Sequence, residues 1–177
     1  MSFESEKLEE MLEYTSSRRL FVETGSALGY MAEQAALKFE EVWTVEYHED
    51  YYLSTLQRTY SLNNVKVVRG DSATWLLHIL SMSGWKNAVL FLDAHSVIED
   101  GSDSAPSGVT PVMDELDACL ASKLGMTVII DDRRLFSGNV DGYPSIERIE
   151  AFARSRGFNL VPKLREESDL IVLKSRS

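Results

Sequence analysis

The feature that most constrains this sequence is an alternation of short apolar segments with longer amphipathic ones. Each short segment is bounded by polar or glycine residues, and its β-branched or aromatic content is typical of a strand. We expect strands over Leu20–Val22, Val42–Val45, Val65–Val68, Ala88–Leu92, Thr127–Ile130, Phe158–Val161 and Leu170–Leu173. Strands that alternate with helices favour a mainly parallel sheet with helices on both faces.

Helical periodicity in the intervening segments indicates which helix faces would be buried. Apolar residues share one helical face in three segments: Leu53, Leu56 and Tyr60; Val112, Leu116, Cys119 and Leu120; Ile146, Ile149, Phe152 and Ala153. Thr110-Pro111 is typical of a helix start, and Gly157 is typical of a helix end. The acidic segment 1–17 is predicted to add an N-terminal helix, over residues 3–15.

The alternation ends at the C-terminus. Phe158–Val161 and Leu170–Leu173 are separated by too few residues for a crossover helix, so we expect them to pair antiparallel. The sequence therefore predicts a single α/β domain over residues 1–177, a three-layer sandwich around a seven-stranded sheet. Residues 96–109 are polar and rich in glycine and proline, which predicts a flexible loop near the site.

Composition narrows the function classes. The formal net charge is −10 and the pI is about 4.8, which disfavours nucleic acid as a partner because phosphate binding needs a basic face. Cys119 is the single cysteine, so an internal disulfide is excluded and a reducing, cytoplasmic location is expected. No apolar segment is long enough to span a membrane, so we expect no membrane partner. A small-molecule partner is favoured, and a homo-oligomer is left open.

Acidic side chains follow each of the first five expected strands. They are Glu23, Glu46, Asp71, Asp93 and the pair Asp131-Asp132. The carboxyl ends of parallel strands meet at one sheet edge, which is where open α/β sheets bind ligands. Crowded carboxylates repel one another unless a cation or hydrogen-bond donors satisfy them. The pattern therefore predicts a binding site at this edge.

Each of these features has a simpler structural reading when taken alone. The turn Glu23–Gly29 ends in glycine and opens a helix, which suits either a ligand or tight strand–helix packing. Glu46 lies about 20 residues after Gly25, the spacing of an acid that binds ribose hydroxyls. Asp71 is equally well placed to cap the helix that follows it.

Nicotinamide-dependent dehydrogenases also use a glycine turn with a ribose-binding acid. The segment Thr24-Gly25-Ser26-Ala27-Leu28-Gly29 begins their T-G-x-x-x-G-x-G pattern, but Met31 stands in place of the last glycine. The chain also has no Tyr-x-x-x-Lys pair for the proton relay. A nicotinamide-dependent oxidoreductase is therefore the weaker alternative.

The segment Phe21–Gly29 resembles the first motif of class I S-adenosylmethionine-dependent methyltransferases, which have a Rossmann-like sheet with a terminal antiparallel pair. The resemblance implies S-adenosylmethionine as cofactor. It places the methionine part on Glu23, Gly25 and Gly29, with Thr24 and Ser26 of the same turn and Asp93 beside them. It also implies that Glu46 holds the ribose, that Tyr47 lies beside the adenine, and that Asp71 and Ser72 lie at the adenine end.

Asp93 with Asp131 and Asp132 is similar to the carboxylate set of the catechol O-methyltransferase group. The resemblance implies a divalent cation such as Mg²⁺ on these three residues, aligning the hydroxyls of the acceptor. The lysine of that group is absent, because Ser96 stands in its place. His95 is then the candidate general base, acting with Asp93. Arg133 and Arg134 offer a metal-free explanation, as partners of Asp131 and Asp132.

These observations together predict an enzyme that transfers a methyl group from S-adenosylmethionine to an oxygen of a small molecule. A non-catalytic binding protein with the same fold is the main alternative.

Overall fold

The seven strands lie where the alternation predicts them. The computed structural model describes residues 3–82, 87–95, 110–121, 125–140 and 142–175, so the expected loop 96–109 lies outside the described residues. The strands are β1 (Leu20–Thr24), β2 (Glu41–Glu46), β3 (Val65–Arg69), β4 (Ala88–Leu92), β5 (Met126–Ile130), β6 (Phe158–Val161) and β7 (Ile171–Ser175). They form one sheet in the order β3-β2-β1-β4-β5-β7-β6.

The sheet is mainly parallel, as expected. Strands β1 to β5 run parallel, whereas β7 is antiparallel to both β5 and β6. The final pair is therefore antiparallel, because its short connection only turns the chain round. The sequence did not predict that β7 inserts between β5 and β6.

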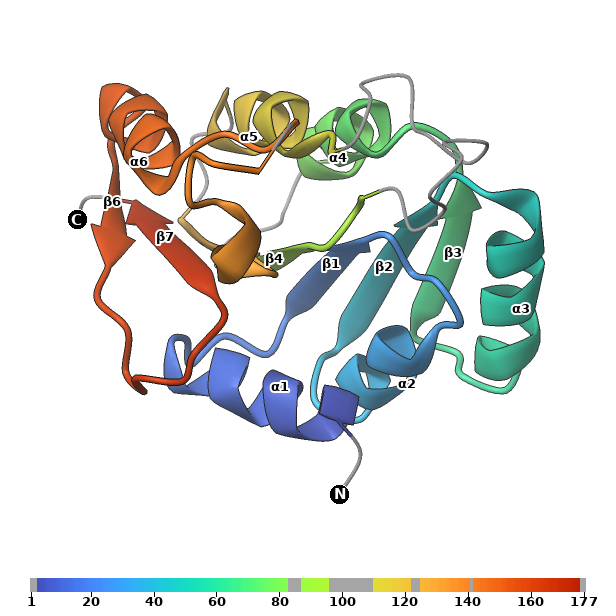
Figure 1. Ribbon diagram of the computed structural model, residues 1–177. Helices are drawn as coiled ribbons and strands as arrows, with labels where there is room; N and C mark the ends of the chain where they lie inside the picture. The colour runs from blue at the N-terminus through green and yellow to red at the C-terminus, as the bar shows by residue number, and fades with distance from the viewer. Residues whose placement is uncertain (1–2, 83–86, 96–109, 122–124, 141, 176–177) are drawn as a thin grey trace.

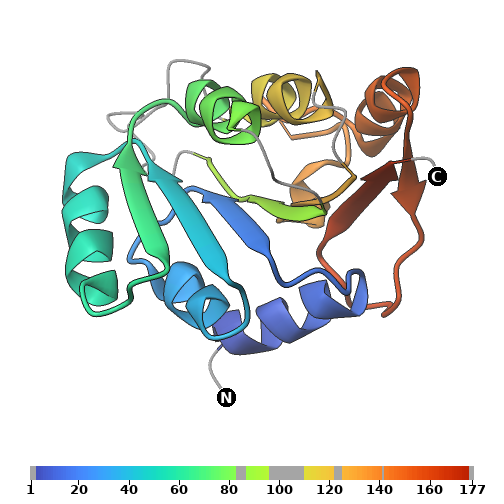
Figure 2. The same ribbon diagram turned by 180° about the vertical axis from the view of Figure 1, so that it is seen from behind.

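Helices cover both faces of the sheet and make it a three-layer sandwich. Figures 1 and 2 show α1, α2 and α3 on one side of the strands and α4, α5 and α6 on the other. The bounds are α1 (Phe3–Glu13), α2 (Tyr30–Ala36), α3 (Glu49–Thr59), α4 (Ser72–Ser81), α5 (Val112–Ala121) and α6 (Ile146–Ser155). A short 3₁₀ helix, η1, spans Arg133–Leu135. Helix α1 ends two residues earlier than expected.

Two of the three predicted helix faces are buried. The apolar residues of α5 are in the core, and those of α6 are in it or packed against it. Helix α3 contradicts the prediction, because Leu53, Leu56 and Tyr60 are all exposed. It packs instead through Thr55 and Thr59. A small side chain is needed here, because Thr55 lies against Gly29 and hydrogen-bonds the carbonyl of Ala27 at 3.1 Å.

The strand order places the candidate site. The chain leaves β1 toward β2 on one side and returns to β4 on the other, so the sheet opens between the carboxyl ends of β1 and β4. Such a reversal is the usual ligand position in an open α/β sheet. Among the described residues, no helix is both long and apolar enough to cross a membrane.

Candidate functional site

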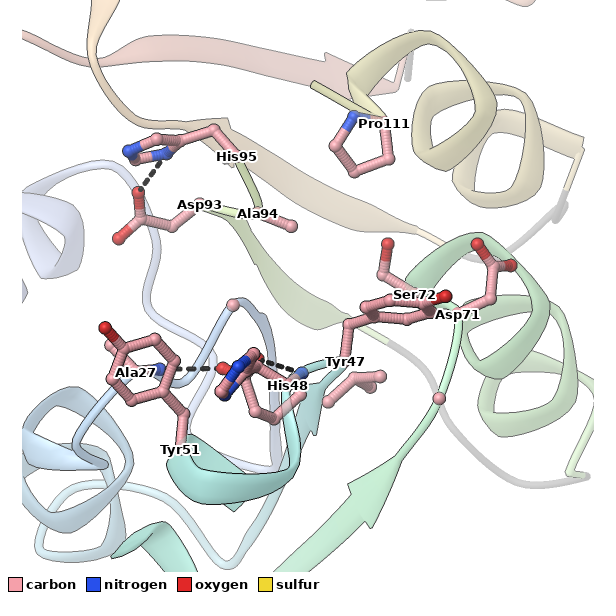
Figure 3. A pocket seen from close by; sticks show the side chains of 14 residues that line it. Ala27, Tyr47, His48, Tyr51, Asp71, Ser72, Asp93, Ala94, His95 and Pro111 are labelled. Atoms are coloured by element: carbon pink, nitrogen blue, oxygen red, sulfur yellow. Dashed lines mark hydrogen bonds and ion pairs between the residues drawn. The ribbon is translucent and has the colours of Figure 1, made fainter. Parts of the chain in front are cut away.

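A cleft with a cavity volume of about 130 Å³ opens at this reversal of strand order. We call it the main cleft. Figure 3 shows its side chains, which come from the carboxyl ends of β1, β2, β3 and β4 and from the helix starts that follow. Of the predicted site residues, it is lined by Gly25, Glu46, Tyr47, Asp71, Ser72, Asp93 and His95.

The glycine turn brings the backbone of β1 close to that of β4. Gly25 has a φ of 76°, and a Cβ there would lie 2.7 Å from the carbonyl oxygen of Asp93. The Asp93 N–H donates to the carbonyl oxygen of Thr24 at 3.2 Å and to its Oγ1 at 3.3 Å. Only glycine allows this contact. Thr24 thus positions Asp93 and does not itself line the cleft.

Glu46 is a buried carboxylate held by donors from the turn after β1. Its Oε2 accepts hydrogen bonds from the Ala27 N–H at 2.9 Å and from Ser26 Oγ at 3.3 Å. Its Oε1 accepts from the His48 N–H at 2.8 Å. Oε2 thus already accepts two hydrogen bonds, whereas Oε1 accepts one and keeps acceptor capacity for a ligand. The simpler reading, a solvated strand end, does not hold, because Glu46 is only 7 % exposed.

Two residues of the main cleft follow Glu46 and were missed in the sequence. His48 and Tyr51 lie at the start of α3 with their ring centres 5.2 Å apart. The Nδ1 of His48 is buried and has no hydrogen-bond partner among the described residues. An unpaired buried polar atom that lines a cleft fits a ligand that supplies the partner. The aromatic residues that follow Glu46 in the sequence were the available signal.

At the other side of the cleft, Asp71 caps α4. Its Oδ1 accepts a hydrogen bond from the Thr74 N–H at 2.8 Å, which confirms the predicted alternative that Asp71 caps the helix after it. Ser72 follows it, is 8 % exposed and also lines the cleft. The helix start thus presents its free backbone N–H groups beside these side chains.

Glu23 lies behind the cleft and does not line it. It is 1 % exposed, and Thr44 Oγ1 donates a hydrogen bond to its Oε2 at 2.5 Å. Burial raises the pKa of Glu23 to about 8, against the opposing effect of the Thr44 hydrogen bond. Glu23 is therefore mostly protonated at neutral pH. Gly29 is also outside the cleft lining, against Thr55.

Asp93, His95 and Asp132 form a group at the ends of β4 and β5. Their candidate ligand atoms all lie within 4.8 Å of one another. His95 Nδ1 is 3.7 Å from Asp93 Oδ1, and its Nε2 is 3.9 Å from Asp132 Oδ2. A dashed line marks the contact between His95 and Asp93 in Figure 3. Burial, followed by the charge of Asp131, raises the pKa of Asp93 well above its usual value. These three residues form a candidate cation site, and its histidine was not in the predicted ligand set.

Asp131 is not part of that group and forms an ion pair instead. Lys7 of α1 reaches its Oδ2, and Asp131 is only 5 % exposed. Arg134 pairs with Asp132 at 2.6 Å and also with Asp169. Asp132 is thus paired with Arg134, as the metal-free explanation expected. Asp131 is paired with a lysine of a distant helix and not with an arginine.

A second, much smaller hollow, with a cavity volume of about 10 Å³, adjoins the main cleft. We call it the side hollow. It shares Asp93 and His95 with the main cleft, and Glu115 of α5 also lines it. Glu115 is 1 % exposed and was missed in the sequence. Its signal was a charged residue on the apolar face of a helix, between Val112 and Cys119.

No family model and no curated protein matches the sequence. The structure does have counterparts among solved structures. TomG, an O-methyltransferase from Streptomyces achromogenes in complex with SAM, matches with a TM-score of 0.67 and 16 % identity, over 100 % of this chain and 82 % of TomG. SMU.1697c from Streptococcus mutans, in complex with SAH, matches with a TM-score of 0.65 and 11 % identity over 99 % of both chains. The chain has the class I methyltransferase fold.

The methyltransferase fold confirms the predicted architecture and leaves the acceptor open. The 23S rRNA methyltransferase ErmE also matches, with a TM-score of 0.58 and 15 % identity, over 97 % of this chain and 68 % of ErmE. The fold thus occurs in TomG, which is described as involved in tomaymycin synthesis, and in ErmE, which is named for 23S rRNA. The expectation that nucleic acid is not a partner stays a prediction.

Proposed function

We propose that this protein is an S-adenosylmethionine-dependent methyltransferase that acts on an oxygen of a small molecule. The observation that carries the cofactor assignment is Glu46, a buried carboxylate with free acceptor capacity at the carboxyl end of β2. Ribose hydroxyls are donors that suit it, and the unpaired Nδ1 of His48 lies in the same cleft. A nucleoside fits these residues.

The charge of the site supports a cationic cofactor. The bound cofactor would supply a methyl group on a positively charged sulfur, and the carboxylates of Glu46, Asp71 and Asp93 line the cleft that would receive it. A negative cleft attracts such a cation and binds the neutral demethylated product less strongly. This difference favours release of the product after transfer.

His95 and its neighbours are the proposed groups for the acceptor. A neutral His95 is suited to take the proton of the acceptor hydroxyl, with Asp93 and Asp132 on either side to stabilise the imidazolium. The same group suits a divalent cation, which would take a nitrogen of His95 as ligand and acidify the hydroxyl directly. The two roles of His95 exclude each other, so a metal titration separates them.

The acidic surroundings favour a small molecule over RNA. The side hollow is lined by Asp93, Asp131, Asp132 and Glu115, and no lysine or arginine of the described chain lines it. RNA binding draws on basic side chains that neutralise phosphates. An oxygen on a compact acceptor avoids that repulsion, as TomG, named as an O-methyltransferase, illustrates for this fold.

Calorimetric titration with S-adenosylmethionine, its demethylated product SAH and reduced nicotinamide dinucleotide tests the cofactor. We expect both methionine-derived ligands to bind and the nicotinamide to bind much more weakly. Absence of SAH binding at millimolar ligand contradicts the proposal, and tighter nicotinamide binding favours the oxidoreductase. Transfer of labelled methyl to a panel of phenols, catechols and total RNA then identifies the acceptor class. Cofactor binding with no turnover on any acceptor favours a non-catalytic protein.

Mn²⁺ titration followed by electron paramagnetic resonance tests the cation site. We expect one bound ion in the wild type and its loss in Asp132→Asn, because that carboxylate supplies a ligand atom of the group. Asp169→Asn is the matched control, since Asp169 shares Arg134 with Asp132 but is not part of the group. Equal Mn²⁺ binding by wild type and Asp132→Asn contradicts this site. Absence of binding to the wild type leaves His95 as the base.

A further inference from the structure

A polar groove lies at the edge of the sheet opposite the main cleft, and the proposed chemistry does not use it. Its cavity volume is about 580 Å³, and we call it the basic groove. Its walls come from residues 14–19, which connect α1 to β1, and from Asn87 and Gly125, which precede β4 and β5. Figure 1 shows that connection at the start of β1, away from its arrowhead. The length of β1, roughly 15 Å, therefore separates the basic groove from the main cleft.

The reversed direction of β7 adds a cation to the basic groove. Strand β7 is antiparallel to β5, with Lys174 opposite Thr127, so the carboxyl end of β7 lies beside the amino end of β5. Both residues line the groove. Lys174 is half-buried, and no acidic side chain of the described chain pairs with it. Its ammonium group is therefore available to a ligand.

Arg18 is held in place with donors to spare. One of its amino groups, Nη1, donates to the carbonyl oxygens of Thr15 at 3.0 Å and Ser17 at 2.8 Å. The guanidinium carbon lies 5.9 Å from the ring centre of Phe39. A guanidinium has five N–H donors, so Nε and Nη2 keep three for a ligand. A side chain that is already positioned loses little freedom when it binds an anion.

Arg19 adds a third cation, and its acidic partner holds it weakly. Its Nε lies 3.7 Å from Glu40 Oε2, and the two side chains are 60 % and 69 % exposed. An exposed pair of this kind contributes about 0–1 kcal/mol. Glu40 is the one acid in the described lining, which thus holds three cations against one anion. In a chain with a net charge of −10, this is a local excess of positive charge.

The rest of the lining consists mainly of small polar side chains. Hydroxyl and amide groups come from Thr15, Ser16, Ser17, Asn87, Thr127 and Ser175. The Oγ of Ser17 is buried and has no hydrogen-bond partner among the described residues. Phosphate oxygens accept hydrogen bonds from guanidinium, ammonium and hydroxyl groups alike. The lining therefore suits a phosphate better than an apolar molecule.

We propose that the basic groove binds a phosphate-bearing ligand, with the phosphate on Arg18, Arg19 and Lys174. The groove is much larger than one phosphate ion, which leaves space for an organic body attached to it. Because the groove lies at the opposite edge of the sheet, this site does not depend on the proposed cofactor or acceptor. It also brings no phosphate to the acidic cleft where methyl transfer is proposed.

Calorimetric titration of the whole chain with pyrophosphate, without divalent cations, tests the site. We expect one bound pyrophosphate, and about tenfold weaker binding in Lys174→Gln, because a charge-assisted contact is lost. Lys163→Gln is the matched control: Lys163 is exposed, lies outside the lining and undergoes the same change of charge. It should bind like the wild type. Absence of wild-type binding at millimolar pyrophosphate overturns the proposal, as do equal losses in the two variants.

Glu40→Gln tests the same site with the opposite sign. It removes the acid from the lining and frees Arg19, so pyrophosphate should bind about threefold more tightly. Glu9→Gln is its control, because Glu9 is also an exposed acid in an ion pair, with Lys38, but lies outside the groove. Both variants change the net charge equally. A Glu40→Gln variant that binds pyrophosphate no more tightly than Glu9→Gln contradicts the site.

Inorganic phosphate and glycerol phosphate distinguish the source of the phosphate. Tighter binding of glycerol phosphate identifies an organic ester as the ligand, and equal binding identifies the free ion. Lys174→Gln should weaken the binding of both, and unchanged binding of both overturns the proposal. Addition of SAH should leave pyrophosphate binding unchanged. Displacement of pyrophosphate by SAH places the anion in the main cleft and also overturns the proposal.

Discussion

At the scale of single residues, Glu46 is fixed by donors on both of its oxygens. An amide in its place would present its NH₂ group to the N–H of either Ala27 or His48, each now within 2.9 Å of an oxygen. We expect Glu46→Gln to bind SAH at least about a hundredfold more weakly, since charge-assisted hydrogen bonds to the ribose are lost and the turn is displaced. Calorimetry measures this, and Glu49→Gln, exposed at the start of α3, should bind normally. Wild-type affinity in Glu46→Gln would exclude Glu46 as the ribose acid.

Gly25 shows how backbone geometry limits one position. Gly25 and Gly157 both have positive φ, of 76° and 84°, but only Gly25 has a neighbour where a Cβ would stand. Gly157→Ala should lower the free energy of unfolding by about 1–2 kcal/mol, the cost of the left-handed conformation. Gly25→Ala should lower it further, because Asp93 must also move. Denaturant unfolding of the two variants measures the difference, and equal losses would mean that the contact with Asp93 is easily relieved.

At the scale of elements, α3 shows why helical periodicity can mislead. Leu53 is 52 % exposed, whereas Thr55 is fully buried and hydrogen-bonds Ser26 Oγ at 2.9 Å. We expect Leu53→Gln to change the free energy of unfolding by less than about 0.5 kcal/mol. Thr55→Ala should lower it by about 1–3 kcal/mol, because buried partners lose a hydrogen bond. Denaturant unfolding measures the free energy of both variants. A larger loss of free energy of unfolding in Leu53→Gln than in Thr55→Ala would mean that the Leu53 face of α3 is covered.

Helix α1 illustrates a contact made between distant elements. Its Lys7 pairs with Asp131 at the end of β5 and lies 5.9 Å from the ring centre of Phe91 in β4. The ammonium group also opposes the effects that raise the pKa of Asp93. The N-terminal helix therefore contributes a charge to the site as well as packing to the core. No spacing in the sequence connects residue 7 to residue 131.

At the scale of the whole molecule, buried acids make stability depend on pH. Glu23 has a pKa of about 8 in the folded chain and 4.5 as its ordinary value. Between these values the folded chain holds a proton that the unfolded chain has released, so the free energy of unfolding falls as pH rises. One such group contributes a slope of at most about 1.4 kcal/mol per pH unit. Glu115, with a pKa of about 7, adds to the slope in the lower part of this window.

Glu23→Gln should reduce that slope between about pH 5 and pH 8, because the amide is neutral in both states. Denaturant unfolding at several pH values measures it. Glu147→Gln is the control: Glu147 is fully exposed and its pKa is lowered, so its titration lies below the window. An unchanged slope in Glu23→Gln would mean that Glu23 is ionised in the folded protein.

The sequence by itself determined the strands, the helices and the edge at which the acids gather. Hydrophobic periodicity is a local property, and parallel strands must bring residues such as Glu46, Asp71 and Asp93 to one edge whatever their side-chain partners. The antiparallel end followed from chain length alone, since the segment between residues 161 and 170 cannot cross the sheet.

Only the tertiary structure decided which partner each acid takes. Asp131 pairs with Lys7 and Asp132 lies beside His95, each across elements far apart in the chain. The exposed face of α3 was decided in the same way, by the space that Gly29 leaves for Thr55. The physical reason is that ion pairing and close packing depend on distances that the whole fold sets. Periodicity and spacing in the sequence carry information only about residues that are near one another along the chain.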